Sequence, residues 1–184
     1  MTTYVDLGAH TGLTVQARCE RYQDDAVWAF EPNPRCIEHP RWTRLLDNYP
    51  QIELVWAAAW VYDGRLDFYG SPHRPDSEWG TVLTGKRNAA IDYEHPVRVH
   101  CLDFSAWLAA ECAAATHLVL KMDIEGAEYA VLERMIETGT LALVDELMIE
   151  FHAKKFGDPT LWQRHEMLLP QLRQAPLELT IFDH

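Results

Sequence analysis

Short apolar runs alternate with amphipathic stretches along most of the chain. The apolar runs predict strands at 4–7, 26–30, 52–60, 97–102, 117–122, 144–151 and 177–182. Helical spacing, caps and stop signals predict helices at 13–22, 35–48, 103–108, 127–137 and 161–172. In the first helix, Leu13, Ala17 and Arg21 share the face that we expect to be buried. This alternation is typical of an α/β fold, a doubly wound and mostly parallel sheet with right-handed crossovers.

The regular alternation of strands and helices stops after the third predicted strand. Asp63-Gly64 separates 58–61 from 66–69, and an Asp-Gly pair between two apolar runs predicts a β-hairpin. The polar loop 71–80 follows. We interpret 61–96 as an insertion that selects the substrate, with Ser77 and Trp79 as its candidate contacts, because loops at the carboxyl end of a sheet often carry such contacts. A surface loop without function is the alternative. The whole chain, 1–184, is otherwise one predicted domain.

The first strand leads into a turn bracketed by Gly8 and Gly12, and Asp6 precedes that turn. Glu31 ends the second strand, nineteen positions after Gly12. This spacing is typical of a nucleotide-binding β-α-β unit, in which glycines let the backbone approach the ligand and a carboxylate accepts both ribose hydroxyls. An ordinary glycine turn, with Asp6 as a helix cap, is the alternative.

His10 indicates which nucleotide this unit binds. A pyrophosphate needs a glycine in the middle of the turn, where this chain has Gly8-Ala9-His10-Thr11-Gly12. A nicotinamide-dependent oxidoreductase is therefore disfavoured. An adenosine without phosphates fits better, and S-adenosylmethionine is the common one. We expect its ribose on Glu31, its ammonium near Asp6 and its carboxylate on N–H groups at the helix start.

Acidic and imidazole groups lie at the carboxyl ends of four of the predicted strands. They are Asp6, Glu31, Asp123 with Glu125, and Glu150 with His152. Parallel strand ends meet at one edge of a sheet, so these groups are expected to share a cleft. Crowded carboxylates need a cation among them, and the sulfonium of S-adenosylmethionine would supply one.

Each of these groups has a structural alternative. Asp123 could cap the helix that begins near Gly126, with Glu125 in its first turn, and His152 could merely end a strand. Glu150 lies within an apolar strand, where a carboxylate needs a partner. Asp123, Glu150 and His152 could hold a divalent cation, which we do not favour.

Composition narrows the function classes. The chain has 184 residues, of which 48% are hydrophobic, and a formal net charge of -12. This charge repels nucleic acid and anionic membranes, and neither is an expected partner. Cys19, Cys36, Cys101 and Cys112 lack metal-ligand or redox spacing, so we expect buried free thiols in a reducing compartment. With no signal segment or membrane span in the sequence, we expect a cytoplasmic protein.

Four segments together resemble the FkbM-type methyltransferase family. They are Val5–Gly12, Phe30–Pro34, Leu120–Glu128 and Ile149–His152. The resemblance spans nearly the whole chain, and the Lys-x-Asp-x-Glu-Gly-Ala-Glu block that begins at Lys121 is its most specific part. It implies a class I, Rossmann-like fold that uses S-adenosylmethionine, usually for O-methylation of a sugar or secondary metabolite. Some relatives resemble N-methyltransferases that act on amide side chains.

The resemblance also implies roles for individual residues. Asp6, Gly8 and Gly12 would form the turn on the methionine side, Glu31 would bind the ribose with Asn33 beside it, and Ala57 and Ala58 would lie near the adenine. The segment from Asp123 to Glu125 would face the transferred methyl group. Our hypothesis is that Glu125 or His152 accepts the proton of the acceptor hydroxyl, while Asp123 and Glu150 position the acceptor or a metal.

The termini are short for this family, with almost nothing before the first strand. We therefore expect a homodimer or a partner subunit to cover them and complete the pocket for a small-molecule or glycan acceptor. The short termini also leave open a catalytically inactive binding or scaffold protein of the same fold. The intact Asp6, Glu31 and Asp123 argue against that alternative.

Overall fold

Two β-sheets organise the protein in this computed structural model, which describes residues 1–23, 25–87 and 90–182. The larger sheet has the order β3-β2-β1-β7-β8-β9, and all of its paired strands are parallel. Its strands are β1 (Thr2–Leu7), β2 (Ala26–Phe30), β3 (Ile52–Val55), β7 (His117–Met122), β8 (Glu146–Ile149) and β9 (Glu178–Ile181). The predicted doubly wound α/β fold is confirmed.

Helices cover both faces of this sheet. They are α1 (Leu13–Arg21), α2 (Pro34–Ile37), α3 (Pro40–Asn48), α4 (Phe104–Glu111), α5 (Glu128–Thr138) and α6 (Pro159–Gln174), with short 3-10 turns η1 (Thr140–Leu143) and η2 (Ala153–Lys155). Side chains of α4, α5 and α6 pack on one face, and those of α1 and α3 pack on the other. Side chains of β1 alternate between the two faces of the sheet. Val5 and Leu7 pack with α4, α5 and α6, and Tyr4 packs with α1 and α3.

The helix predictions need two corrections. The helix expected at 35–48 is divided into α2 and α3, because His39 caps a new helix that has Pro40 in its first turn. In α1 the buried residues are Val15 and Cys19. The face expected to be buried was wrong, since Leu13, Ala17 and Arg21 are all exposed. The pair Asp24-Asp25 in the sequence also predicts the end of this helix, but Asp24 lies outside the described residues.

The smaller sheet overturns the predicted hairpin. It consists of β4 (Ala58–Trp60), β5 (Gly64–Phe68) and β6 (Val97–Asp103), in the order β4-β6-β5. β6 lies between the two segments and pairs with both, parallel to β4 and antiparallel to β5. The strand expected at 52–60 is also two strands in different sheets, because the chain turns where Ala57 N–H donates to the carbonyl of Val55. Local pattern identified these segments as strands but not their partners.

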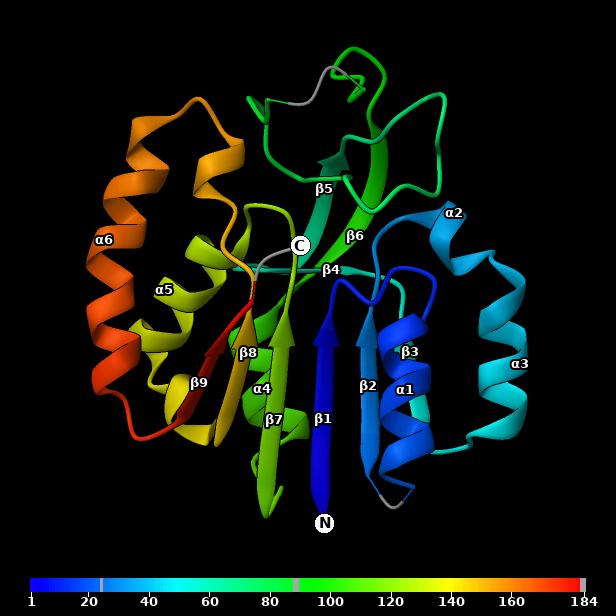
Figure 1. Cartoon of the computed structure of the whole chain (residues 1–184), viewed down its shortest axis with the longest axis vertical. Coiled ribbons are helices and arrows are strands. Elements are labelled where there is room, and N and C mark those ends of the chain that lie inside the picture. The colour runs from blue at the N-terminus through cyan, green and yellow to red at the C-terminus, as the bar shows by residue number, and fades with distance from the viewer. Residues whose placement is uncertain (24, 88–89, 183–184) are drawn as a thin grey trace.

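The carboxyl ends of the strands in the large sheet lie on the side of the small sheet. In Figure 1 the arrowheads of the large sheet point towards β5, β6 and the loops of the insertion between them. The four cysteines, Cys19, Cys36, Cys101 and Cys112, are buried free thiols, as expected. None of the helices in the described ranges has the length and apolar character needed to cross a membrane.

Candidate active site

A cavity of about 450 Å³ lies where the carboxyl ends of β1, β2, β7 and β8 meet the insertion. This is the edge of an open α/β sheet at which ligands bind, and the volume lies within the usual range for ligand pockets. Of the residues predicted to form the site, the cavity is lined by Gly8, His10, Glu31, Asn33, Ala57, Ala58, Ser77, Trp79, Asp123, Glu125 and Glu150. Leu13 also lines it, which explains its exposure.

Glu31 forms part of one wall. Its Oε2 accepts the N–H of His10 at 2.7 Å, and its Oε1 accepts the N–H of Asn33 at 2.8 Å. Two backbone N–H groups thus fix the plane of a carboxylate that is only 6% exposed. Each oxygen has further capacity to accept a hydrogen bond. Burial raises the pKa of Glu31, against the lowering effect of these two N–H groups.

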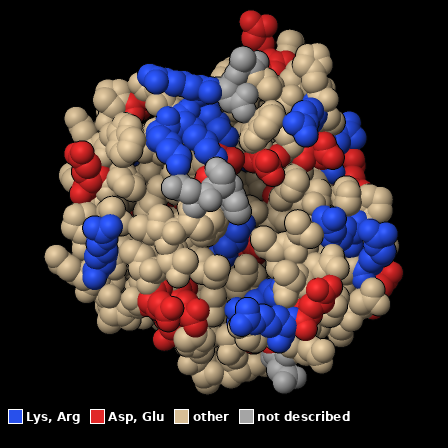
Figure 2. Space-filling model, viewed as in Figure 1, with Lys and Arg blue, Asp and Glu red and all other residues tan. Residues whose placement is uncertain are grey.

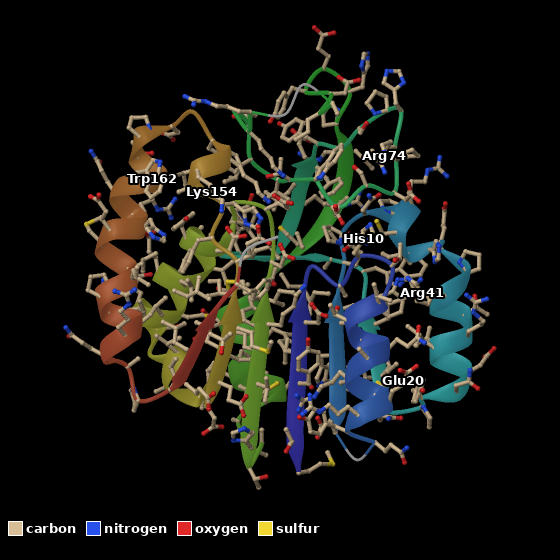
Figure 3. All side chains as sticks on the ribbon, viewed as in Figure 1. His10, Glu20, Arg41, Arg74, Lys154 and Trp162 are labelled. Carbon is tan, nitrogen blue, oxygen red and sulfur yellow. The ribbon has the colours of Figure 1, made fainter. Side chains whose placement is uncertain are left out.

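The insertion is fastened over this wall by two polar contacts. His10 Nε2 donates to the carbonyl of Asp76 at 2.6 Å, and Asn33 Nδ2 donates to that of Pro75 at 2.9 Å. Figure 3 shows His10 at the top of the large sheet, beneath the loop that carries Arg74. The backbone of His10 is left-handed, with φ of 52°, a conformation that non-glycine residues seldom adopt outside functional sites. These contacts bring Ser77 and Trp79 to the cavity.

Asp6 lies behind the cavity rather than in its lining. It is fully buried, and its Oδ1 lies 3.0 Å from the Nζ of Lys121, which is the residue beside it on β7. Lys121 lines the cavity and also donates to the carbonyl of Gly8. A buried carboxylate needs a cationic partner, and Lys121 fills the place beside Asp6 where we expected a ligand ammonium.

The two glycines of the turn have different surroundings. Gly8 lines the cavity with φ of 84°, and a Cβ on it would stand 1.9 Å from the carbonyl oxygen of Asp123. Gly12 does not line the cavity. A Cβ there would stand 2.7 Å from Leu45 Cδ1, so Gly12 allows α3 to pack against the turn.

The opposite wall is acidic, and the chain supplies its own cations. Lys86 of the insertion forms a short ion pair with Glu125, and both side chains are buried. Lys155 Nζ lies 3.1 Å from Glu150 Oε1, and Lys121 Nζ lies 3.7 Å from Asp123 Oδ2. Our expectation that a ligand sulfonium would be needed to separate these carboxylates is therefore wrong.

His152 lies beneath this wall and has no exposed surface. Its Nδ1 is 2.8 Å from Glu128 Oε1, and its Nε2 faces Glu125, Glu150 and Asp123 at 3.2, 3.4 and 3.6 Å. Burial by itself would lower the pKa of His152, but the hydrogen bond to Glu128 and the charges of Glu128 and Glu125 outweigh it and raise the pKa. These contacts favour the protonated form of the imidazole, and His152 does not line the cavity.

Burial shapes the titration of the two cavity-facing acids. It raises the pKa of Glu125, with His152 and Lys86 opposing the shift. It likewise raises the pKa of Asp123, against Lys121 and His152. Glu125 has a left-handed backbone with φ of 55°, and its carbonyl accepts Thr81 Oγ1 at 2.7 Å. Asp123 does not cap α5, whose N-cap is Ala127.

Within the described part of the chain, Asp123, Glu125 and His152 offer ligand atoms within 4.8 Å of one another. This set shares two residues with the cation site that we considered from the sequence. Lys86 already neutralises Glu125, and Lys121 already compensates Asp123. A divalent cation would have to displace or approach these ammonium groups, so it stays the less favoured alternative.

Four residues of the site have no role in the sequence hypothesis: Lys86, Lys121, Lys155 and Glu128. The role of Lys121 could have been predicted from the sequence, since a lysine inside an apolar strand requires a buried anion as its partner. The role of Lys86 could not have been predicted from the sequence, because its partner Glu125 is 39 positions away along the chain.

Comparison with known proteins agrees with this geometry. A profile of the methyltransferase FkbM domain matches residues 6–175, which include both walls of the cavity and the insertion. No curated protein and no solved structure matches the chain. The match covers most of the sequence, and its range includes all the residues that line the cavity described above. The chain therefore belongs to the FkbM methyltransferase family.

Proposed function

We propose that the protein uses S-adenosylmethionine to methylate a hydroxyl group of a small molecule, a sugar or secondary metabolite. One observation carries the proposal. A single cavity has a wall suited to a nucleoside, with Glu31 and Ala57–Ala59, and a second wall with the acids Asp123 and Glu125. A cofactor bound to the first wall would point its reactive end at the second.

The donor set of the first wall fits the cofactor. The oxygens of Glu31 each accept one backbone N–H and retain capacity for the two hydroxyls of a ribose. Ala57, Ala58 and Ala59 have small side chains that leave room for a flat adenine ring beside Phe68. Gly8 has no side chain, so the ligand can approach its backbone closely. The ammonium group of Lys121 lines the same cavity and can attract the methionine carboxylate.

The second wall suits proton removal. When bound, S-adenosylmethionine supplies a methyl group on a sulfonium, which leaves as a neutral thioether. The acceptor oxygen gains this methyl group and loses its proton, and Glu125 is the base that we propose. Its pKa is raised by burial, which brings a carboxylate closer to the neutral range in which a general base works well. We do not propose His152 as the base, because its side chain is fully buried and its Nδ1 is hydrogen-bonded to Glu128. Its proposed role is to position the residues around it.

Calorimetric titration with S-adenosylmethionine is the first test. We expect saturable heat with one site per chain. A titration without heat would remove the proposed enzyme and favour a scaffold protein of the same fold. The second test supplies labelled methyl donor with sugars, small alcohols and peptides. Label on a sugar or alcohol oxygen supports the proposal, whereas label confined to amide or amine nitrogen would replace it with N-methylation.

We also propose a cytoplasmic location, because four buried thiols without disulfides suit a reducing compartment. The net charge of -12 makes nucleic acid and anionic membranes unsuitable partners. A homodimer is part of the same proposal and would be detected as a doubled mass in light scattering.

A further inference from the structure

Two segments with adjacent basic residues meet beside the acidic wall. Lys86 forms an antiparallel β-bridge with Phe156, and the N–H of Arg87 donates to the carbonyl of Lys155 at 2.7 Å. The insertion thus contributes Lys86-Arg87, and the segment after β8 contributes Lys154-Lys155. We call Arg87, Lys154 and Lys155 the basic rim. In Figure 2, Lys and Arg side chains gather on the same face, over the region where Figure 3 labels Lys154.

Two lysines at the acidic wall, Lys86 and Lys155, are already paired with carboxylates. Lys86 is paired with Glu125. Lys155 is paired with Glu150 but is 30% exposed, lines the cavity and lies 3.9 Å from Glu125 Oε1. The lysines of the cavity are therefore each paired with a carboxylate of this chain, and among them Lys155 is partly exposed.

Arg87 differs from these lysines. Its side chain is exposed, and within residues 1–23, 25–87 and 90–182 its guanidinium has no hydrogen bond or ion pair. It lies over the backbone of Gly157, where an added Cβ would stand 3.2 Å from the Arg87 Nε. The guanidinium therefore lies near Gly157 with its donors available, and the backbone of Arg87 is bonded to that of Lys155, which lines the cavity.

A concentration of positive charge is unexpected in this chain, whose 28 acidic residues outnumber its 16 lysines and arginines. Such a local field attracts anions and positions them, and arginine recognises carboxylate and phosphate through two parallel hydrogen bonds. An anion at the rim would lie beside Lys155, whose Nζ lies 3.9 Å from Glu125 Oε1.

We propose that the methyl acceptor carries a carboxylate or phosphate group, which Arg87 binds at the rim with help from Lys155 while the reacting hydroxyl lies at Glu125. This inference rests on the proposed methyltransferase function and narrows its substrate class from sugars and secondary metabolites in general to anionic ones.

The test measures binding to the full-length chain by calorimetry. The probes are inorganic phosphate, acetate, glucose, glucuronic acid and glucose 6-phosphate. We expect glucuronic acid or glucose 6-phosphate to bind about tenfold or more tightly than glucose, and the preferred one identifies the anion. The advantage should shrink as ionic strength rises from about 0.01 M to about 0.15 M.

Arg87→Glu should remove this advantage and should abolish the binding of the simple anion that the wild type prefers. Arg44→Glu is the matched control, since Arg44 is an exposed arginine on α3 and the charge change is the same. Circular dichroism and thermal melting of both variants check that they fold. Arg87→Glu should still bind S-adenosylmethionine with the wild-type heat.

Three results would overturn the inference: equal affinity for neutral and acidic sugars, equal losses in the two variants, or no binding of any anionic probe. Cofactor binding separates this failure from that of the function. If the wild type binds S-adenosylmethionine and methylates neutral acceptors as well as acidic ones, only the substrate class is wrong. If it binds no cofactor, the proposed function fails as well.

Discussion

The Nδ1 of His152 lies 2.8 Å from the Oε1 of Glu128, and neither side chain has any exposed surface. Glu128 also accepts the N–H groups of Ile124 and Gly126, at 3.0 Å and 2.9 Å. One buried carboxylate therefore holds both the imidazole and the loop that presents Glu125, in which Glu125 and Gly126 have positive φ. We interpret His152 as a positioning residue that fixes the acidic wall from below.

The charge on His152 should make stability depend on pH. Because the pKa of His152 is raised in the folded protein, folding favours its protonated form. This stabilisation is fully present below the ordinary histidine pKa of about 6.5 and is lost as the pH rises through the raised value. Urea unfolding of the wild type from about pH 6 to about pH 9 should show this loss.

The variant His152→Gln should lack this part of the pH dependence. At neutral pH it should also be less stable by about 3 to 5 kcal/mol, the usual cost of removing one partner of a buried ion pair. His100→Gln, at an exposed position on β6, is the control and should follow the wild-type curve. Parallel curves for the wild type and His152→Gln would contradict a charged imidazole.

Glu125→Gln should separate chemistry from binding. The amide keeps the shape of the side chain but cannot accept a proton, so we expect methyl transfer to slow by about 10² to 10⁴. Cofactor affinity should stay within a few-fold of wild type, measured by calorimetry beside the rate. Glu111→Gln, at an exposed position on α4, should change neither. An undiminished rate in Glu125→Gln would remove this base from the mechanism.

Glu31→Gln should weaken cofactor binding more than it slows turnover. The amide loses the negative charge and turns an N–H₂ group towards one of the two backbone donors that Glu31 now accepts. A hydrogen bond to a charged group contributes about 1.5 to 3 kcal/mol, so we expect the dissociation constant for S-adenosylmethionine to rise about tenfold to a hundredfold. Glu53→Gln, on the exposed side of β3, serves as the comparison. Equal affinities would show that this carboxylate does not bind the ligand.

Gly8→Ala and Gly139→Ala should differ sharply although both glycines have positive φ. The added Cβ at 8 would stand 1.9 Å from the carbonyl oxygen of Asp123, whereas nothing lies within 4 Å of one at 139. We expect Gly139→Ala to cost about 1 to 2 kcal/mol, the penalty of the left-handed backbone alone. Gly8→Ala should exceed about 4 kcal/mol or fail to fold, as measured by chemical denaturation. Similar costs would mean that the turn can move away from Asp123.

Much of the site was predictable because parallel strands present their ends at one edge. This rule alone placed Glu31, Asp123, Glu125 and Glu150 together, and all four line the cavity. It could not tell which groups at that edge face the ligand. Asp6 ends up behind Lys121, because the residue beside it on the neighbouring strand is a lysine that needs a buried anion.

Contacts through the insertion could not be read from local pattern. A period of two residues identifies a strand but leaves its neighbour open, so β4 and β5 looked like a hairpin until β6 was found between them. The same separation hid Lys86, which reaches Glu125 only because 85–87 lies against 155–157. The fold class can therefore be predicted from the periodicity of apolar residues. The position of Lys86 in the site cannot, because it depends on pairing between segments that are far apart in the sequence.

The pair of Asp6 and Lys121 also constrains how this sequence can evolve. The two residues lie opposite each other on β1 and β7 with almost no access to water. Replacing Lys121 would leave the buried carboxylate of Asp6 without its cation, and replacing Asp6 would remove the nearer of the two carboxylates that pair with Lys121. Exchanging both for apolar residues would avoid that penalty but would remove the ammonium group from the cavity. Among descendants of a common ancestor, positions 6 and 121 should therefore covary, and lineages that lose the pair together should be those that have abandoned methyl transfer.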